Sequence, residues 1–172
     1  MGTEIQSCFV GKQKKNLVTL FGYSSRSVPG IEINGLGKWG KLVKEKIIFI
    51  TRSRSLPIPL KRFVLNVEVL DGMGKLETSN VQWLELPLLT LYWYLASLLP
   101  ILTLENCFLA GSLSPRGEIK HPSKDVIFSN EMLEKIQEYN LNVIASSSQL
   151  LPQKIQTIDI KDLFRDIPSL EL

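Results

Sequence analysis

The chain has 172 residues, of which 44% are hydrophobic and 22% are charged, and this suits one compact domain with an ordinary buried core. Lys and Arg number 20 against 17 Asp and Glu, and the resulting net charge of +3 is too small for a dedicated nucleic-acid-binding protein. The two cysteines, Cys8 and Cys107, lie far apart without CxxC or Cys/His companions. This spacing excludes a sequence-encoded zinc site or disulfide framework and favours a cytoplasmic location.

The first part of the chain combines short strands with one helix. Apolar and β-branched residues between Gly, Lys and Ser turns predict three strands within residues 5–33, at 5–10, 17–23 and 28–33. Apolar residues then recur at helical spacing among Lys and Glu, which predicts an amphipathic helix over residues 36–50, before the Arg-Ser-Arg-Ser run at 52–55. The segment 62–70 alternates and predicts a strand whose better-buried face carries Phe63, Leu65, Val67 and Val69.

Residues 86–104 are an uncharged run of 19 residues, formally long enough for a membrane span. Pro100 would end a helix, so we expect a helix over residues 87–99. At ~1.5 Å per residue its length is about 20 Å, short of the ~30 Å hydrocarbon core. The aromatic run 92–94 also lies in mid-segment, whereas interfacial aromatics lie at the ends of a span. We therefore predict a buried core helix and no stable membrane span, with a membrane-seated helix as the alternative.

The C-terminal part, residues 106–167, alternates strands and helices. The pattern predicts strands at 107–110, 141–145 and 155–158, and helices at 130–139 and 159–166. Ser129 or Asn130 caps the first of these helices, and the Ser-Pro-Arg-Gly sequence at 114–117 predicts a turn. The chain has no internal repeat, so the whole order predicts a single α+β domain over residues 1–172.

Four sequence blocks carry a resemblance to a known family. They are, in order, residues 8–36, with Val-Pro-Gly-Ile-Glu-Ile-Asn-Gly-Leu at their end and Val43-Lys44-Glu45 after them, residues 56–67 (LPIPLKRFVLNV), residues 85–89 (ELPLL) and residues 109–119 (LAGSLSPRGEI). The blocks resemble the domain that precedes the ATPase module in the ComM/YifB branch of the Mg-chelatase-like AAA+ family. With a fainter echo to Ile167, the resemblance covers nearly the whole chain.

The resemblance implies the ribosomal protein S5 domain 2-like fold, which that domain shares with the proteolytic domain of Lon. It also implies descent from a hexameric motor that remodels DNA, so the expected partners are a separately encoded AAA+ ATPase and DNA, and an oligomer is expected. The Walker motifs of the family are absent here, which favours a non-catalytic accessory domain in DNA processing or recombination, with no cofactor and no metal. The alternative is a degenerate Lon-like domain that binds a protein or peptide in the former Lon groove, at the helix that begins near Glu85.

The segment 35–42 (GLGKWGKL) meets the GxxxxGK pattern of a phosphate-binding loop. Leu42 stands where Ser or Thr must bind Mg²⁺, and no downstream strand ends in a Walker-B-like acidic residue. We therefore interpret the segment as a glycine-rich turn with basic residues, rather than as a nucleotide site.

The resemblance also raises the serine–lysine dyad of Lon, in which a lysine activates a serine for acyl transfer. By block order the serine position falls on Glu85 and the lysine position falls near Val126, so neither group is present. Replacements for them would be Ser112, Ser114 and Lys120, but these belong to a turn sequence. The pattern therefore does not favour a peptidase.

His121 is the only histidine and the only candidate for acid–base work near neutral pH. Its neighbours are Lys120 and Pro122, so we interpret it as a solvated loop residue. The aromatic residues at 92–94 are interpreted as core packing rather than as a cofactor site.

Cations are concentrated between residues 38 and 62, where the sequence has eight Lys and Arg but only one acidic residue, Glu45. A helix face rich in Lys beside an Arg-Ser-Arg loop would track a phosphate backbone, with an aromatic ring as a stacking platform. The predicted nucleic-acid-binding residues are Lys38, Trp39, Lys41, Lys44, Arg52, Arg54, Lys61 and Arg62. The alternative is a solvated helix face beside a flexible loop.

Overall fold

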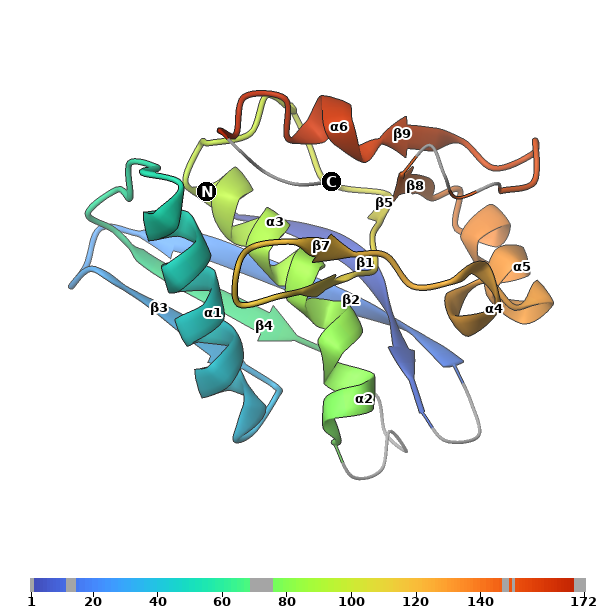
Figure 1. Ribbon diagram of the computed structural model, residues 1–172, viewed down its shortest axis with the longest axis horizontal. Coiled ribbons are helices and arrows are strands. Elements are labelled where there is room, and N and C mark those ends of the chain that lie inside the picture. Colours follow the sequence, from blue (N-terminus) through green and yellow to red (C-terminus); the bar gives the residue numbers. More distant parts are fainter. Residues whose placement is uncertain (1, 12–14, 69–75, 147–148, 150, 169–172) are drawn as a thin grey trace.

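The computed structural model describes residues 2–11, 15–68, 76–146, 149 and 151–168, and these form an α+β fold, as the sequence predicts (Figure 1). Among them, seven strands form one mixed sheet: β1 (Gly2–Val10), β2 (Lys15–Ser25), β3 (Gly30–Asn34), β4 (Arg62–Val67), β5 (Cys107–Phe108), β8 (Asn142–Ala145) and β9 (Thr157–Asp159). Their order is β3-β4-β2-β1-β5-β8-β9, and β2 pairs antiparallel with both neighbours while the other pairs are parallel. A small antiparallel hairpin joins β6 (Ser112–Leu113) to β7 (Ile119–Lys120).

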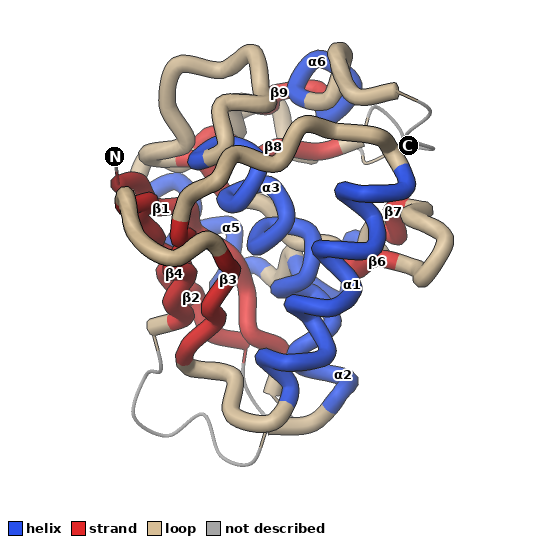
Figure 2. Tube along the Cα trace, turned by 90° about the vertical axis from the view of Figure 1, so that its left-hand side faces the viewer, coloured by secondary structure: helices blue, strands red, loops and turns tan. Residues whose placement is uncertain are grey.

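Two helices, α1 (Trp39–Ser53) and α3 (Glu85–Leu95), pack against one face of the first four strands. Figure 2 shows strands β1 to β4 on one side and these helices on the other. The main core fills the space between the two layers and includes Ile5, Leu20, Leu65 and Ile47. Smaller helical segments complete this layer: α2 (Thr78–Val81), the 3-10 turn Gln82–Leu84 and α6 (Ile160–Leu163).

The opposite face of the sheet is covered only in part. Helices α4 (Lys124–Ile127) and α5 (Asn130–Glu138) cover it with a second apolar cluster, which includes Cys8, Phe108, Met132 and Val143. Side chains alternate along a strand, so in β1 Ile5 and Phe9 belong to the first cluster while Cys8 belongs to the second. Helix α5 reaches β2 near Leu17, but the β3–β4 part of this face has no helix packed on it among the described residues.

The N-terminal strands lie where the pattern predicts them, with differences at their ends. Strand β3 begins at Gly30 rather than at Val28, whose side chain is exposed. Strand β4 buries Phe63, Leu65 and Val67 as predicted but ends at Val67. The predicted continuation to residue 70, with Val69, lies outside the described residues.

Helix α1 begins and ends three residues later than predicted. The left-handed backbone of Gly35 (φ 89°) and Gly37 (φ 53°) keeps residues 35–38 in a turn, so the helix starts at Trp39. At the other end Ser55 is left-handed (φ 54°), and the N–H groups of Ser55 and Leu56 donate to the carbonyls of Arg52 and Thr51. This closure is a Schellman motif. It ends the helix at Ser53, inside the Arg-Ser-Arg-Ser run, rather than before the run.

Helix α3 is buried along its whole length, as the core interpretation predicts. Trp93 donates its indole N–H to Thr51 Oγ1 at 2.9 Å, and Tyr92 packs edge-on against Phe63. The helix begins at Glu85 and ends at Leu95, short of the predicted residue 99, because Ser97 (φ 60°) closes a second Schellman motif before Pro100 is reached. In the described part of the chain, no helix combines the length and apolar character that crossing a membrane requires.

The C-terminal elements occur as predicted but are shorter. Ser129 caps α5 by accepting from the Met132 N–H at 3.3 Å, and Asp159 caps α6 by accepting from the Lys161 N–H at 2.9 Å. Helix α6 spans one turn, against the predicted 159–166. The Ser-Pro-Arg-Gly sequence forms the β6–β7 turn, in which Gly117 has φ 88°.

Candidate functional sites

The GxxxxGK segment forms the turn between β3 and α1. A Cβ at Gly35 would overlap the Val67 carbonyl oxygen, and a Cβ at Gly40 would lie 3.0 Å from the Ile33 carbonyl oxygen. These glycines therefore let the turn and the helix approach strands β3 and β4. The geometry accounts for the glycines without a bound phosphate, in line with the turn interpretation.

Trp39 is held against the protein at the start of α1. Its indole N–H donates to the Leu76 carbonyl at 3.2 Å, and the Lys38 ammonium lies 5.0 Å from the ring centroid. The ring is half-buried and packs against the main core. One face and one edge of the ring are thus engaged, and stacking of a base on the ring stays a prediction.

Arg54 is used within the fold. Its guanidinium packs against Gly117, where an added Cβ would lie 2.7 Å from Nη2, and Nη2 lies 3.5 Å from the Arg116 carbonyl oxygen. The Arg54 side chain therefore links the end of α1 to the β6–β7 turn. This contact brings Arg116, which the sequence analysis did not select, beside the predicted cations.

Arg62 forms an exposed ion pair at the start of β4. Its Nη2 lies 2.5 Å from Glu32 Oε2 on the neighbouring strand β3. This hydrogen bond lowers the pKa of the Glu32 carboxyl below its ordinary value and raises the pKa of Arg62. Because the pair is fully exposed, water screens it. Among the predicted nucleic-acid-binding residues, Arg62 thus has its positive charge balanced by the neighbouring Glu32.

The remaining cations divide between the two ends of α1. Lys38, Lys41 and Lys44 belong to its first two turns, whereas the others lie at the far end of the helix layer. There Arg26 follows Ser25, the β2 partner of Arg62. We call this second group the basic end; it comprises Arg26, Arg52, Arg54, Lys61, Arg62 and Arg116. The structure thus gathers four of the eight predicted residues at the basic end with two that were missed.

A buried polar contact joins α1, α3 and β6. Lys46 Nζ lies 2.6 Å from Glu85 Oε1 and donates to the Leu113 carbonyl at 2.8 Å, while Glu85 Oε2 accepts from the Leu113 N–H at 2.8 Å. Glu85 is buried and Lys46 is partly buried. We call these three residues the Lys46–Glu85–Leu113 contact. It occupies the position to which the resemblance assigns the Lon serine.

The predicted groove at the Glu85 helix is filled. Every residue of α3 is buried, the Gly111 N–H donates to the Trp83 carbonyl, and the Leu86 N–H donates to the Gly111 carbonyl, both at 3.0 Å. A Cβ on Gly111 would lie 2.6 Å from a Leu86 methyl carbon. A peptide could reach Glu85 only if the β6–β7 hairpin moved away.

His121 is not the solvated loop residue that the sequence predicts. Both of its ring nitrogens are shielded from solvent and have no hydrogen-bond partner among the described residues. Burial lowers its pKa below the ordinary value of 6.5, so the ring is neutral near pH 7. The flanking Lys120 is exposed as expected, but Pro122 is buried. His121 therefore lies where the chain passes from the surface into the protein.

The two cysteines are free and buried. Burial raises the pKa of Cys8 to about 12 and also raises that of Cys107, so both thiols stay protonated at neutral pH. Among the described residues no group of His, Cys, Asp and Glu side chains is arranged to hold a metal ion.

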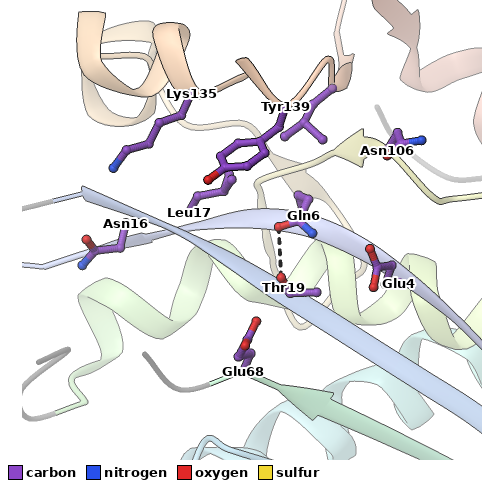
Figure 3. Close-up of a pocket in the computed structure, with 10 residues that line it drawn as sticks. Glu4, Gln6, Asn16, Leu17, Thr19, Glu68, Asn106, Lys135 and Tyr139 are labelled. Atoms are coloured by element: carbon purple, nitrogen blue, oxygen red, sulfur yellow. Dashed lines mark hydrogen bonds between the residues drawn. The ribbon is translucent and has the colours of Figure 1, made fainter. Parts of the chain in front are cut away.

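A polar cleft of about 470 Å³ lies on the open side of the sheet, beside α5. Figure 3 shows Gln6 and Thr19 on its floor, joined by a hydrogen bond of 3.2 Å, with Lys135 and Tyr139 on the α5 side. Its two acids, Glu4 and Glu68, form no ion pair with any described residue. No sequence motif marked this cleft, because its lining comes from β1, β2, α5 and the ends of other elements, which are far apart in the chain.

Comparison with known proteins does not assign the chain to a family. No family model matches it, and no curated protein matches it significantly.

Proposed function

We propose that this chain is a non-catalytic accessory domain of the Mg-chelatase-like, ComM type, which acts in the cytoplasm with a separately encoded AAA+ ATPase in DNA processing or recombination. The observation that carries the proposal is the Lys46–Glu85–Leu113 contact. At the position that the resemblance assigns to a nucleophilic serine, both oxygens of a carboxylate are engaged by the protein itself. Such a site holds the fold together and leaves no activated nucleophile.

The arrangement of the four resembling blocks also supports an S5 domain 2-like fold. The first two blocks supply strands of one layer, where β2 and β3 both pair with β4. The third and fourth blocks contact each other through Glu85, Leu86, Gly111 and Leu113. Segments that carry the resemblance are thus neighbours in space, as parts of one inherited unit would be.

The basic end supports DNA as a ligand. It gathers six cations from four separate segments, with the Arg62–Glu32 pair as its one ion pair between described residues. Phosphate contacts of this kind give binding that falls steeply with salt. The basic end would therefore place the domain on DNA without reading sequence.

The proposal is tested by recovering the tagged full-length chain from its native cells, with and without nuclease treatment, and identifying what co-purifies. We expect an AAA+ ATPase that is retained after nuclease, together with DNA that is lost in high salt. Recovery of neither an ATPase nor nucleic acid would overturn the proposal. A salt-tolerant protein partner without an ATPase would instead favour the degenerate Lon-like binding module.

A further inference from the structure

Two exposed patches lie on opposite faces of the β1–β4 part of the molecule. The first, the sheet patch, lies on the open side of the sheet and comprises Glu4, Phe21, Tyr23 and Glu68. The second, the helix patch, lies on the outward side of α1 and comprises Lys38, Lys41, Leu42 and Phe49. Figure 2 shows α1 on the side of the strands away from their open face.

The sheet patch combines two aromatic side chains with unpaired acids. Phe21 and Tyr23 are 43% and 47% exposed, although both are large apolar groups on a central strand. Leu20 and Gly22, which alternate with them, face the helices: Leu20 is in the main core, and a Cβ on Gly22 would lie 3.1 Å from Leu95.

The acids of the sheet patch lie beside these rings. Glu4 pairs in register with Phe21, so the two side chains share a face. Glu68 lies on the same side and lines the cleft together with Glu4. Two cations lie near these acids, but both are paired: Arg62 with Glu32, and Lys135, which lines the same cleft, with Glu131. The unpaired Glu4 and Glu68 therefore leave the patch acidic.

The helix patch combines apolar groups with cations. Leu42 and Phe49 are 59% and 56% exposed, and they lie two turns apart on one stripe of α1. Lys38 and Lys41 are exposed at the start of the same stripe, and Glu45 is its one acid. Apolar side chains such as these form protein contacts, whereas phosphates are bound by charged and polar groups.

We infer that the helix patch of one copy of this chain docks on the sheet patch of a second copy. Lysines would meet the unpaired Glu4 and Glu68, and Leu42 and Phe49 would cover Phe21 and Tyr23, so charge and apolar surface are both complementary. Nucleic acid does not fit the sheet patch, because its two carboxylates repel phosphates.

The position of the two patches determines the kind of assembly. They lie on opposite faces of the two layers, so one contact cannot satisfy both patches of both partners. The contact is therefore head-to-tail, and it generates a ring or a filament instead of a symmetric dimer. This inference does not depend on the ATPase and DNA proposals, although Phe49 of the helix patch and Arg52 of the basic end line the same shallow hollow on α1.

The experiment is analytical ultracentrifugation of the full chain over a wide concentration range, with Phe49→Glu and Phe21→Lys as opposite blocking variants. Both side chains are exposed, so the fold should tolerate the changes, and circular dichroism checks this. We expect the wild type to associate and each variant alone to associate at least tenfold more weakly, because each loses an aromatic anchor and gains a repelling charge. Leu102→Glu, at an apolar residue 96% exposed outside both patches, is the matched control and should behave as the wild type.

The decisive measurement mixes the two folded variants. Each retains one intact patch, and the intact patches are complementary, so the mixture should associate at concentrations where neither variant does alone. A wild type that stays monomeric at every concentration would overturn the inference. A Phe21→Lys variant that associates as the wild type does would also overturn it, because the contact would then join helix to helix. A mixture that contains only monomers would overturn it as well.

Discussion

Lys46 Nζ lies 2.6 Å from Glu85 Oε1, although 39 residues separate them in the chain. Glu85 also accepts from the Leu113 N–H, so its removal would leave the partly buried Lys46 ammonium without a counter-charge and the buried Leu113 N–H without a partner. We expect Glu85→Ala to lower the free energy of unfolding by about 2–4 kcal/mol. Lys46→Met should cost less, because Glu85 then keeps its bond to Leu113.

Urea unfolding measures both changes. The control is Lys135→Met, which removes the Lys135–Glu131 pair of 3.0 Å on α5 and should cost less than about 0.5 kcal/mol. If Glu85→Ala proved as mild as this control, the Lys46–Glu85–Leu113 contact would not be a structural element, and the non-catalytic proposal would lose its main support.

Three glycines should follow a graded series: Gly35 and Gly37 in the GxxxxGK segment, and Gly30, which precedes it. Gly35 combines a left-handed φ with a Cβ position that overlaps the Val67 carbonyl oxygen, Gly37 has the left-handed φ alone, and Gly30 has neither neighbours nor a left-handed φ. We expect Gly35→Ala to cost at least about 2 kcal/mol, Gly37→Ala about 1 kcal/mol and Gly30→Ala close to nothing. Thermal unfolding with and without Mg²⁺-ATP makes the test, and a rise in Tm with nucleotide would contradict the turn interpretation.

His121 makes stability depend on pH. In the unfolded chain His121 is protonated with the ordinary pKa of 6.5, whereas in the folded state its pKa is lower, so it is protonated only at a lower pH. The unfolded state therefore binds more protons in that window, and the free energy of unfolding should fall as the pH drops from about 7.5 to about 5. In His121→Gln this fall should be smaller. An identical urea midpoint profile for both proteins would show that His121 does not carry the effect.

The basic end predicts how DNA binding responds to charge reversal. Arg52→Glu with Lys61→Glu should weaken binding to a fluorescent DNA duplex and reduce the salt slope by about two, since each lost phosphate contact contributes about one. Lys154→Glu with Lys161→Glu is the matched control, because both lysines are exposed near the opposite, β9 edge of the sheet. Equal losses in the control would mean that net charge, and not the basic end, governs binding.

The elements that the sequence predicts well are those whose signal is local. The alternation in Phe63, Leu65 and Val67 predicts which face of β4 is buried, and Ser129 predicts the start of α5. Helix ends were less predictable: α3 ends by a left-handed Ser97, and nothing in its type distinguishes that serine from others. The α+β class follows from the order of such local signals.

The candidate sites depended on contacts between distant segments. Periodicity along a chain determines which side chains share a face of a helix or strand. It does not determine which two faces pack together, because that depends on the packing of whole elements. Packing places Arg54 against Gly117 and Trp39 against Leu76, and no local pattern predicts either contact. The same packing draws His121 inward and joins Lys46 to Glu85. The sequence by itself thus determined the strands, the helices and the total charge, while only the tertiary structure decided which charges remain exposed and where they gather, since burial is a property of the assembled layers.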